Sequence, residues 1–255
     1  MDDTAKRRVA LVTGGSRGIG MAIARALASS GHDVAITARD AEQGADAVAE
    51  LIALGAHAYA VAMDVANPTD VDEAVTAIGA VLGSPDVVVN NAGVAGAKPF
   101  QSLTVEEWDE SMNVNARGAF LVTRACLPAM LEANWGRVIN VASTAALEGV
   151  PYAAHYAASK HALLGMTRSL ALEVARKGIT ANCVCPGFVE TEMTERSIEN
   201  IVKATARSPE QARRALEANS PARRLIQPEE IGAAVAFLAS DAAYGVNGTH
   251  VVING

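Results

Sequence analysis

The sequence has few aromatic residues and few cysteines. Phe, Trp and Tyr together make up 4% of its 255 residues, and the three cysteines are Cys126, Cys183 and Cys185. The cysteines are odd in number and lack the spacing of metal ligands, so we predict no metal site. Cys183 and Cys185 alternate within an apparent strand and are interpreted as buried packing residues. A reducing cytoplasm is the compartment that we expect.

Long apolar runs and clusters of positive charge are also missing. No apolar run reaches the ~18 residues that indicate a membrane span. The first residues, MDDTAKRRVA, lack the apolar core of a signal peptide. The net charge is −7, and no basic cluster stands out. We therefore expect a protein that binds neither a membrane nor nucleic acid.

Short apolar runs that alternate with helical segments are the main positive feature. The runs cover residues 9–14, 34–38, 58–65, 86–93, 136–143, 180–187 and 249–253. Most are continuously apolar, which is typical of strands in a parallel sheet that helices cover on both faces. The pattern predicts the α/β class, with one Rossmann-type, doubly wound parallel sheet of about seven strands. No linker interrupts it, so we expect a single domain over residues 1–255.

A glycine-rich turn follows the first run and precedes a helical pattern. Its sequence, VTGGSRGIG, has the spacing G-x-x-x-G-x-G. Glycines let the backbone approach a pyrophosphate, and the helix N-terminus offers free amides and partial positive charge. The cofactor-binding residues expected here are Gly14, Ser16, Arg17, Gly18, Ile19 and Gly20. A purely structural strand–helix turn is the alternative.

The end of the second run bears on which dinucleotide would bind. An acidic residue there favours NAD, and an arginine favours the extra phosphate of NADP. Ala38 takes the expected acid position and Arg39 follows it, while Arg17 could reach the same phosphate from the glycine turn. This pattern predicts NADP(H). The alternative is that both arginines are solvated and that Asp40 is the acid.

Two further strand ends carry small and polar residues. Asp64 could accept a hydrogen bond from an adenine amino group, with the Val65 backbone nearby. Asn91, Ala92 and Gly93 end the fourth run, where a cofactor could pass close to the backbone. Each stretch alone is weak, because Asn and Asp often cap strands and helices.

The stretch YAASK places Tyr156 and Lys160 four residues apart, on one face of a predicted helix. A free phenol has a pKa of ~10, and a nearby ammonium is expected to lower it. Ser143 ends the fifth run and could hydrogen-bond a substrate oxygen. Asn115 lies in the helical region after the fourth strand and could anchor a water linked to Lys160. Together these side chains predict a proton-transfer group.

These motifs, in this order, resemble those of the short-chain dehydrogenase/reductase family over essentially the whole chain. The resemblance implies hydride transfer with a nicotinamide cofactor and a homodimer or homotetramer. It implies a catalytic tetrad of Asn115, Ser143, Tyr156 and Lys160, of which Tyr156 and Lys160 also contact the cofactor. By the same matching, the nicotinamide would be flanked by Pro186, Gly187, Val189 and Thr191.

The substrate is less well defined by the sequence. Residues 190–227 form a long polar excursion, interpreted as a lid over the substrate or, alternatively, as an oligomer contact or a solvated helix pair. The run from Tyr156 to Met193 is similar to aromatic polyketide ketoreductases and to 3-oxoacyl-carrier-protein reductases. This resemblance implies NADPH-dependent reduction of a polyketide ketone or β-ketoacyl thioester, possible carrier-protein attachment of the substrate, and Tyr156 as general acid. VAGAKPF after NNAG departs from the PGG-type motif of the polyketide enzymes, which leaves the handedness of the alcohol open.

Two other functions stay open. A hydroxyacyl or other secondary-alcohol dehydrogenase would use the same residues in the opposite direction. A non-catalytic NADP(H)-sensing protein would keep the fold without turnover. Every tetrad position is filled, which favours an enzyme.

Overall fold

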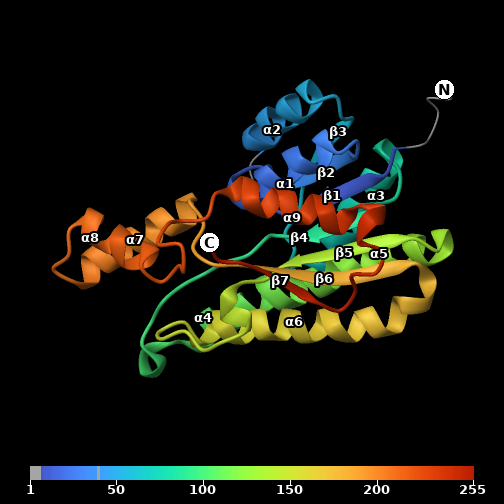
Figure 1. Ribbon diagram of the computed structural model, residues 1–255. Helices are drawn as coiled ribbons and strands as arrows, with labels where there is room; N and C mark the ends of the chain where they lie inside the picture. The colour runs from blue at the N-terminus through green and yellow to red at the C-terminus, as the bar shows by residue number, and fades with distance from the viewer. Residues whose placement is uncertain (1–6, 39–40) are drawn as a thin grey trace.

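A parallel sheet between two layers of helices forms the body of the chain (Figure 1). The computed structural model describes residues 7–38 and 41–255. The strands are β1 (Val9–Val12), β2 (Asp33–Ala38), β3 (Ala58–Ala62), β4 (Val87–Asn90), β5 (Gly136–Val141), β6 (Ile179–Pro186) and β7 (His250–Ile253). Their order in the sheet is β3-β2-β1-β4-β5-β6-β7, and all neighbours are parallel. The predicted doubly wound sheet is confirmed.

Different helices cover the two faces of the sheet, and alternate residues of a strand pack against one set of helices or the other. The helices are α1 (Gly18–Ser29), α2 (Ala41–Ala53), α3 (Pro68–Val81), α4 (Val105–Met112), α5 (Ala119–Ala133), α6 (Ala154–Val174), α7 (Glu192–Ala204), α8 (Pro209–Glu217) and α9 (Pro228–Ala239). Ala10 and Val12 pack with α1, α2 and α9 in one buried cluster. Val9 and Leu11 pack with α3, α5 and α6 in another. Successive side chains of a strand point to opposite faces, so each strand serves both layers.

Several strands end earlier than their apolar runs. Strand β4 stops at Asn90, so Asn91–Gly93 follow it as loop, and β3 stops at Ala62, before Asp64. The chain therefore leaves the sheet as loop at the carboxyl edge of these strands. Strand β1 lies between β2 and β4, so the order of the strands reverses there. Ligands of open α/β sheets bind at such a reversal.

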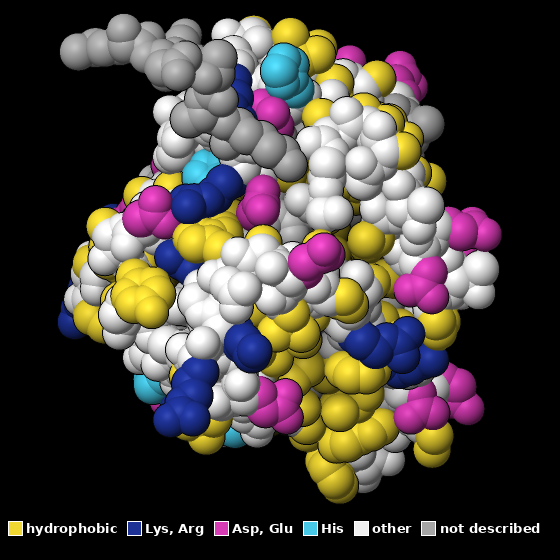
Figure 2. Space-filling model, turned by 90° about the vertical axis from the view of Figure 1, so that its right-hand side faces the viewer, with side chains coloured by type: hydrophobic (Ala, Val, Ile, Leu, Met, Phe, Trp, Pro, Cys, Tyr) yellow, Lys and Arg dark blue, Asp and Glu magenta, His cyan; other side chains and the backbone are white. Residues whose placement is uncertain are grey.

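Figure 2 shows the face of the molecule that lies on the right in Figure 1. On this face, basic and acidic side chains are interspersed, and hydrophobic side chains gather in one patch in the lower part of the view. Arg8 and Arg137 both stack on Trp135, with 3.6 and 4.2 Å from each guanidinium carbon to the ring centroid. Asp241 accepts a hydrogen bond from Arg8 at 2.9 Å. Within residues 7–38 and 41–255, no helix is long and apolar enough to span a membrane.

Residues 190–227 leave the carboxyl edge and return to it, and α7 and α8 project away from the sheet (Figure 1). Four side chains give this segment a small core of its own, namely Ile198, Ala212, Leu216 and Leu225. The segment is helical, as its sequence predicts, but its interpretation as a lid stays a prediction.

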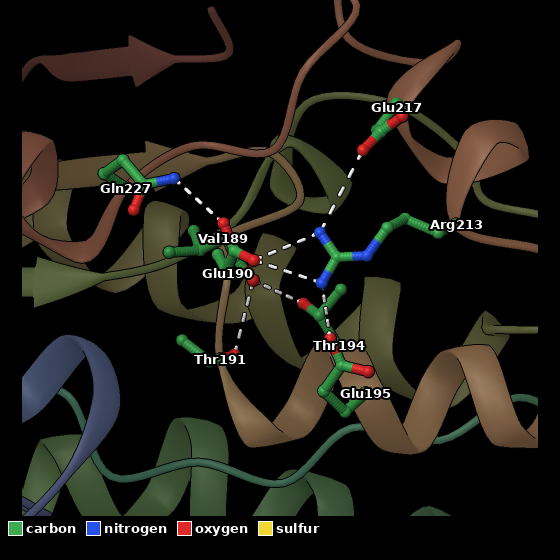
Figure 3. A network of polar contacts seen from close by, with 8 residues as sticks. All are labelled: Val189, Glu190, Thr191, Thr194, Glu195, Arg213, Glu217 and Gln227. Atoms are coloured by element: carbon green, nitrogen blue, oxygen red, sulfur yellow. Dashed lines mark hydrogen bonds and ion pairs between the residues drawn. The ribbon is translucent and has the colours of Figure 1, made fainter. Parts of the chain in front are cut away.

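One guanidinium joins the parts of this segment (Figure 3). Arg213 of α8 donates to Glu190 with two nitrogens at 3.1 Å each and to Glu195 of α7 at 2.7 Å. Glu190 also accepts from Gln227, at the other end of the segment, at 3.0 Å. Glu190 thus ties the beginning of the segment both to its end and to α8.

We expect Arg213→Met to loosen the segment without unfolding the sheet. Exposed ion pairs contribute about 0–1 kcal/mol each, so the free energy of unfolding should change little. Amide hydrogen exchange in α7 and α8 should become faster, while exchange in β1, β4 and β5 stays unchanged. Lys203→Met is the matched control, because it removes only an exposed pair with Glu199 within α7. Unchanged exchange in the Arg213 variant would contradict the role of the network.

Candidate active site

The glycine turn and the NNAG loop are joined by hydrogen bonds at the point where the strand order reverses. The amide of Asn91 donates to the carbonyl oxygens of Thr13 and Gly14 at 2.9 and 3.1 Å. The Thr13 hydroxyl accepts from the backbone N–H groups of Asn91 and Ala92 at 3.0 and 2.9 Å. The structure therefore brings together two stretches that the sequence separates by more than 70 residues.

The glycine turn has the close approaches that its sequence predicts. A Cβ atom on Gly20 would lie 2.1 Å from the carbonyl oxygen of Gly14, and Gly14 itself has a φ of +62°. At Gly18 a Cβ atom would meet nothing nearer than Thr191 at 3.6 Å. The turn leads directly into the N-terminus of α1, next to Ser16 and Ile19. Open backbone at a helix N-terminus suits a pyrophosphate.

Arg17 lies at the exposed rim of this turn and has a carboxylate partner. Its guanidinium donates to Glu192, in the first turn of α7, at 2.6 Å. Ala38 ends β2, so no acid occupies that strand end. Arg39 and Asp40 lie outside the described residues. The phosphate contact of Arg17 stays a prediction, and Glu192 is the partner that the sequence did not indicate.

Asp64 and Val65 lie in the loop after β3. A side-chain oxygen of Asp64 accepts from the backbone N–H of Ala66 at 2.9 Å. Val65 is buried and would be 2.8 Å from a Cβ atom on Gly118. Both residues therefore shape this loop, and their contact with an adenine stays a prediction.

Tyr156, Lys160 and Ser143 come together at the carboxyl edge of β5. Lys160 is only 5% exposed, and its ammonium donates to the carbonyl oxygen of Val141 at 2.8 Å. The same nitrogen lies 5.7 Å from the centroid of the Tyr156 ring. The Ser143 hydroxyl accepts from the backbone N–H of Ala145 at 3.1 Å. Helix α6 thus presents the phenol and the amine to the end of the strand that carries the serine.

Burial governs the protonation of this group. It raises the pKa of Tyr156 above its ordinary value, and a hydrogen bond with Ser143 offsets part of that shift. Burial also lowers the pKa of Lys160 to about 8. The sequence predicted a lowered pKa for this phenol, and the direction is the opposite, because desolvation outweighs the hydrogen bond with Ser143. The phenol is therefore protonated at neutral pH.

Asn115 lies in a π-helical turn, residues 113–118, between α4 and α5. Its amide donates to the carbonyl oxygen of Val94 and to the Ser159 hydroxyl, both at 2.9 Å, and its oxygen accepts from the Val94 N–H at 2.8 Å. A Cβ atom on Gly93 would lie 3.1 Å from that oxygen and 3.7 Å from the Lys160 nitrogen. The side chain therefore fixes the loop after NNAG against α6. Water binding by Asn115 stays a prediction.

The residues after β6 face the glycine turn. Strand β6 ends at Pro186, and Gly187 donates its N–H to Ile253 at 2.9 Å. Val189 forms a bridge with Ile226, and Thr191 lies beside Gly18. This stretch and the glycine turn border the same edge of the sheet, so the residues present fit a dinucleotide.

Three residues that contribute to the site were not predicted. Thr13 joins the two loops, Ser159 holds Asn115, and Glu192 pairs with Arg17. In the sequence, Thr13 lies at the end of an apolar run and has nothing that marks it as a site residue. Ser159 lies inside YAASK, so that motif could have indicated it. For Glu192 the sequence offers none, since the pair spans 175 positions.

Similarity to known proteins extends over nearly the whole chain. Residues 14–255 match the family model described as enoyl-(acyl carrier protein) reductase. The chain is 41% identical to the granaticin polyketide synthase putative ketoacyl reductase 1 of Streptomyces violaceoruber, over 95% of this chain and 90% of that protein. It is 41% identical to the 3-oxoacyl-[acyl-carrier-protein] reductase of Vibrio cholerae, over 97% and 96%.

A solved structure agrees along almost the whole length. A variant of actinorhodin polyketide ketoreductase, crystallised with NADPH, superposes with a TM-score of 0.94 at 39% identity, and the match covers 98% of this chain and 96% of that one. The fold, the family model and the identities agree, so the chain is an oxidoreductase that belongs to the short-chain dehydrogenase/reductase family.

Proposed function

We propose that the chain is an NADPH-dependent ketoreductase that reduces a polyketide ketone or a β-ketoacyl thioester to the alcohol. The observation that carries this proposal is the half-buried Tyr156, whose phenol lies beside Ser143 and the buried ammonium of Lys160. A phenol whose pKa lies above its ordinary value keeps its proton at neutral pH, and can give it to a carbonyl oxygen as the alcohol forms. The protonated phenol is the form that reduction uses, whereas oxidation of an alcohol would need the phenolate.

Each neighbour of the phenol has a part in this step. When bound, NADPH supplies the hydride. Ser143 donates its hydroxyl hydrogen to the oxygen on which negative charge develops. Tyr156 protonates that oxygen, and the phenolate left behind is stabilised by the Lys160 ammonium, 5.7 Å from the ring centroid. Asn115 keeps the loop at Gly93 against Lys160, so its role is positioning.

The substrate class rests on the relatives. One relative is named a ketoacyl reductase of a polyketide synthase, and another a 3-oxoacyl-[acyl-carrier-protein] reductase. The test is the loss of NADPH absorbance with a bicyclic ketone, a β-ketoacyl thioester and the same acyl group on a carrier protein. Preference for the bicyclic ketone supports the polyketide assignment, and preference for a linear thioester supports the acyl assignment. No turnover with any of them would contradict the proposal.

Tyr156→Phe should lower kcat at least ~100-fold, because it removes the proton donor and keeps the ring. Binding of NADPH, measured by fluorescence titration, should change by less than about twofold, since the substitution removes only a neutral hydroxyl group. Tyr244→Phe is the control, because Tyr244 is exposed and lies near Arg137, away from the site. Turnover that survives in the Tyr156 variant would remove the proposed acid.

The rate of reduction should fall as pH rises through about 8. Lys160 has a pKa lowered to about 8, so its ammonium is present below that pH and is lost above it, while Tyr156 keeps its proton. Without the ammonium, the phenolate formed in each turnover loses its stabilising charge. The measurement is kcat from pH 6 to 10, with NADPH binding followed over the same range. A rate that is flat to pH 10 would contradict this role.

Arg17→Ala should weaken NADPH binding about 10- to 100-fold and change NADH binding by less than about twofold, because only NADPH carries the extra phosphate. Arg196→Ala is the matched control, since Arg196 also pairs with Glu192, at 3.9 Å, from within α7. The measurement is the dissociation constant of each cofactor. An equal loss for both cofactors would mean that Arg17 does not select NADPH.

A further inference from the structure

A cavity of about 480 Å³ adjoins the glycine turn at the start of α1. The turn and α1 form one wall, α2 forms a second, and Glu192 of α7 with the start of α9 forms a third. The first wall includes Ser16 and Gly18, which are predicted to bind the cofactor, and Arg17, which is predicted to bind the extra phosphate of NADPH. The cavity therefore lies where that phosphate is expected.

The described residues of these walls carry more negative than positive charge. Arg17 and Arg25 share the walls with four carboxylates, namely Asp46, Glu50, Glu192 and Glu229. Arg25 donates to Glu50 at 3.0 Å, and Arg17 donates to Glu192 at 2.6 Å. Each guanidinium thus already has a carboxylate partner. A phosphate that binds to Arg17 must compete with Glu192.

Glu192 belongs to a helix that begins beside the glycine turn. It is the first residue of α7, and Thr191 directly precedes it. A Cβ atom on Gly18 would lie 3.6 Å from the Thr191 side chain. Arg17 directly precedes Gly18, at the start of α1. The ion pair therefore joins the first residue of α7 to the residue that is predicted to select NADPH.

The phosphate and the carboxylate cannot share Arg17 without repulsion. A phosphate monoester carries about two negative charges at neutral pH, and Glu192 carries one. Anions that bind to one guanidinium lie a few ångströms apart, where like charges repel each other. NADH has a hydroxyl in place of this phosphate, and the pyrophosphate is common to both cofactors. Glu192 therefore opposes the binding of NADPH more than that of NADH.

The ion pair can be exchanged for another because it lies in solvent. The Arg17 and Glu192 side chains are 47% and 67% exposed, and exposed ion pairs contribute little to stability. Arg196, one turn further along α7, lies 3.9 Å from the same carboxylate oxygen. Glu192 can therefore leave Arg17 and keep a cation beside it. The phosphate can take its place on Arg17, with a loss of affinity.

We propose that Glu192 is a specificity-determining residue, which holds Arg17 until the extra phosphate of NADPH displaces it and so weakens the preference for NADPH over NADH. The inference rests on the proposed NADPH-dependent function. It adds the residue that limits how strongly this cofactor is selected.

The test is the dissociation constant of each cofactor, measured without a ketone. Glu192→Gln should tighten NADPH binding about three- to tenfold, because it removes both the ion pair and the repulsion, and should change NADH binding by less than about twofold. Glu199→Gln is the matched control, since it removes an exposed carboxylate of α7 whose partner is Lys203 of the same helix. It should leave both constants unchanged. An equal gain for both cofactors, or no gain for NADPH, would overturn the proposal.

A double variant shows whether Glu192 acts through Arg17. In the Arg17→Ala background, Glu192→Gln should change NADPH binding by less than about twofold, because no guanidinium remains to compete for. The full gain in this background would mean that the carboxylate acts by its charge alone, and would overturn the proposal. These measurements need no turnover. If no ketone is reduced but the gain for NADPH depends on Arg17, the ketoreductase function fails and the competition stands.

Discussion

The hydrogen bonds between Thr13 and Asn91 hold together the loops on which the rest of the site depends. They join the ends of β1 and β4 where the strand order reverses, so the glycine turn and the NNAG loop cannot move independently. Gly93 follows directly and lies against Asn115 and Lys160. These hydrogen bonds therefore position both the glycine turn, whose backbone fits a pyrophosphate, and the loop beside Lys160. Both neighbouring strands supply its atoms, which is why a parallel sheet places a site at this edge.

Desolvation sets the chemistry that this framework supports. In water, an ammonium beside a phenol would favour the phenolate, but here Lys160 is buried and Tyr156 is half-buried, and loss of water disfavours either charged form. It raises the pKa of Tyr156 and lowers the pKa of Lys160 to about 8. The result is a proton donor next to an amine that is still mostly charged at neutral pH.

The sequence predicted the features that depend on local pattern. Continuous apolar runs identified all seven strands, and the motif spacing placed Ser143, Tyr156 and Lys160 close together. A contact between distant parts of the chain was missed: Arg17 in the glycine turn pairs with Glu192 of α7. The direction of the Tyr156 shift was also wrong, because a sequence shows which charges are present but not how much water surrounds them.

Direct titration of Tyr156 tests the central claim most closely. In protein labelled with ¹³C at Cζ of tyrosine, each of Tyr59, Tyr152, Tyr156 and Tyr244 gives a resonance that moves when its phenol ionises. Comparison with the Phe variant assigns the signal of Tyr156. We expect this signal to stay in its protonated position beyond pH 10, the ordinary pKa of a tyrosine. Ionisation of Tyr156 near neutral pH would show that Lys160, and not burial, controls the phenol, and would contradict the account.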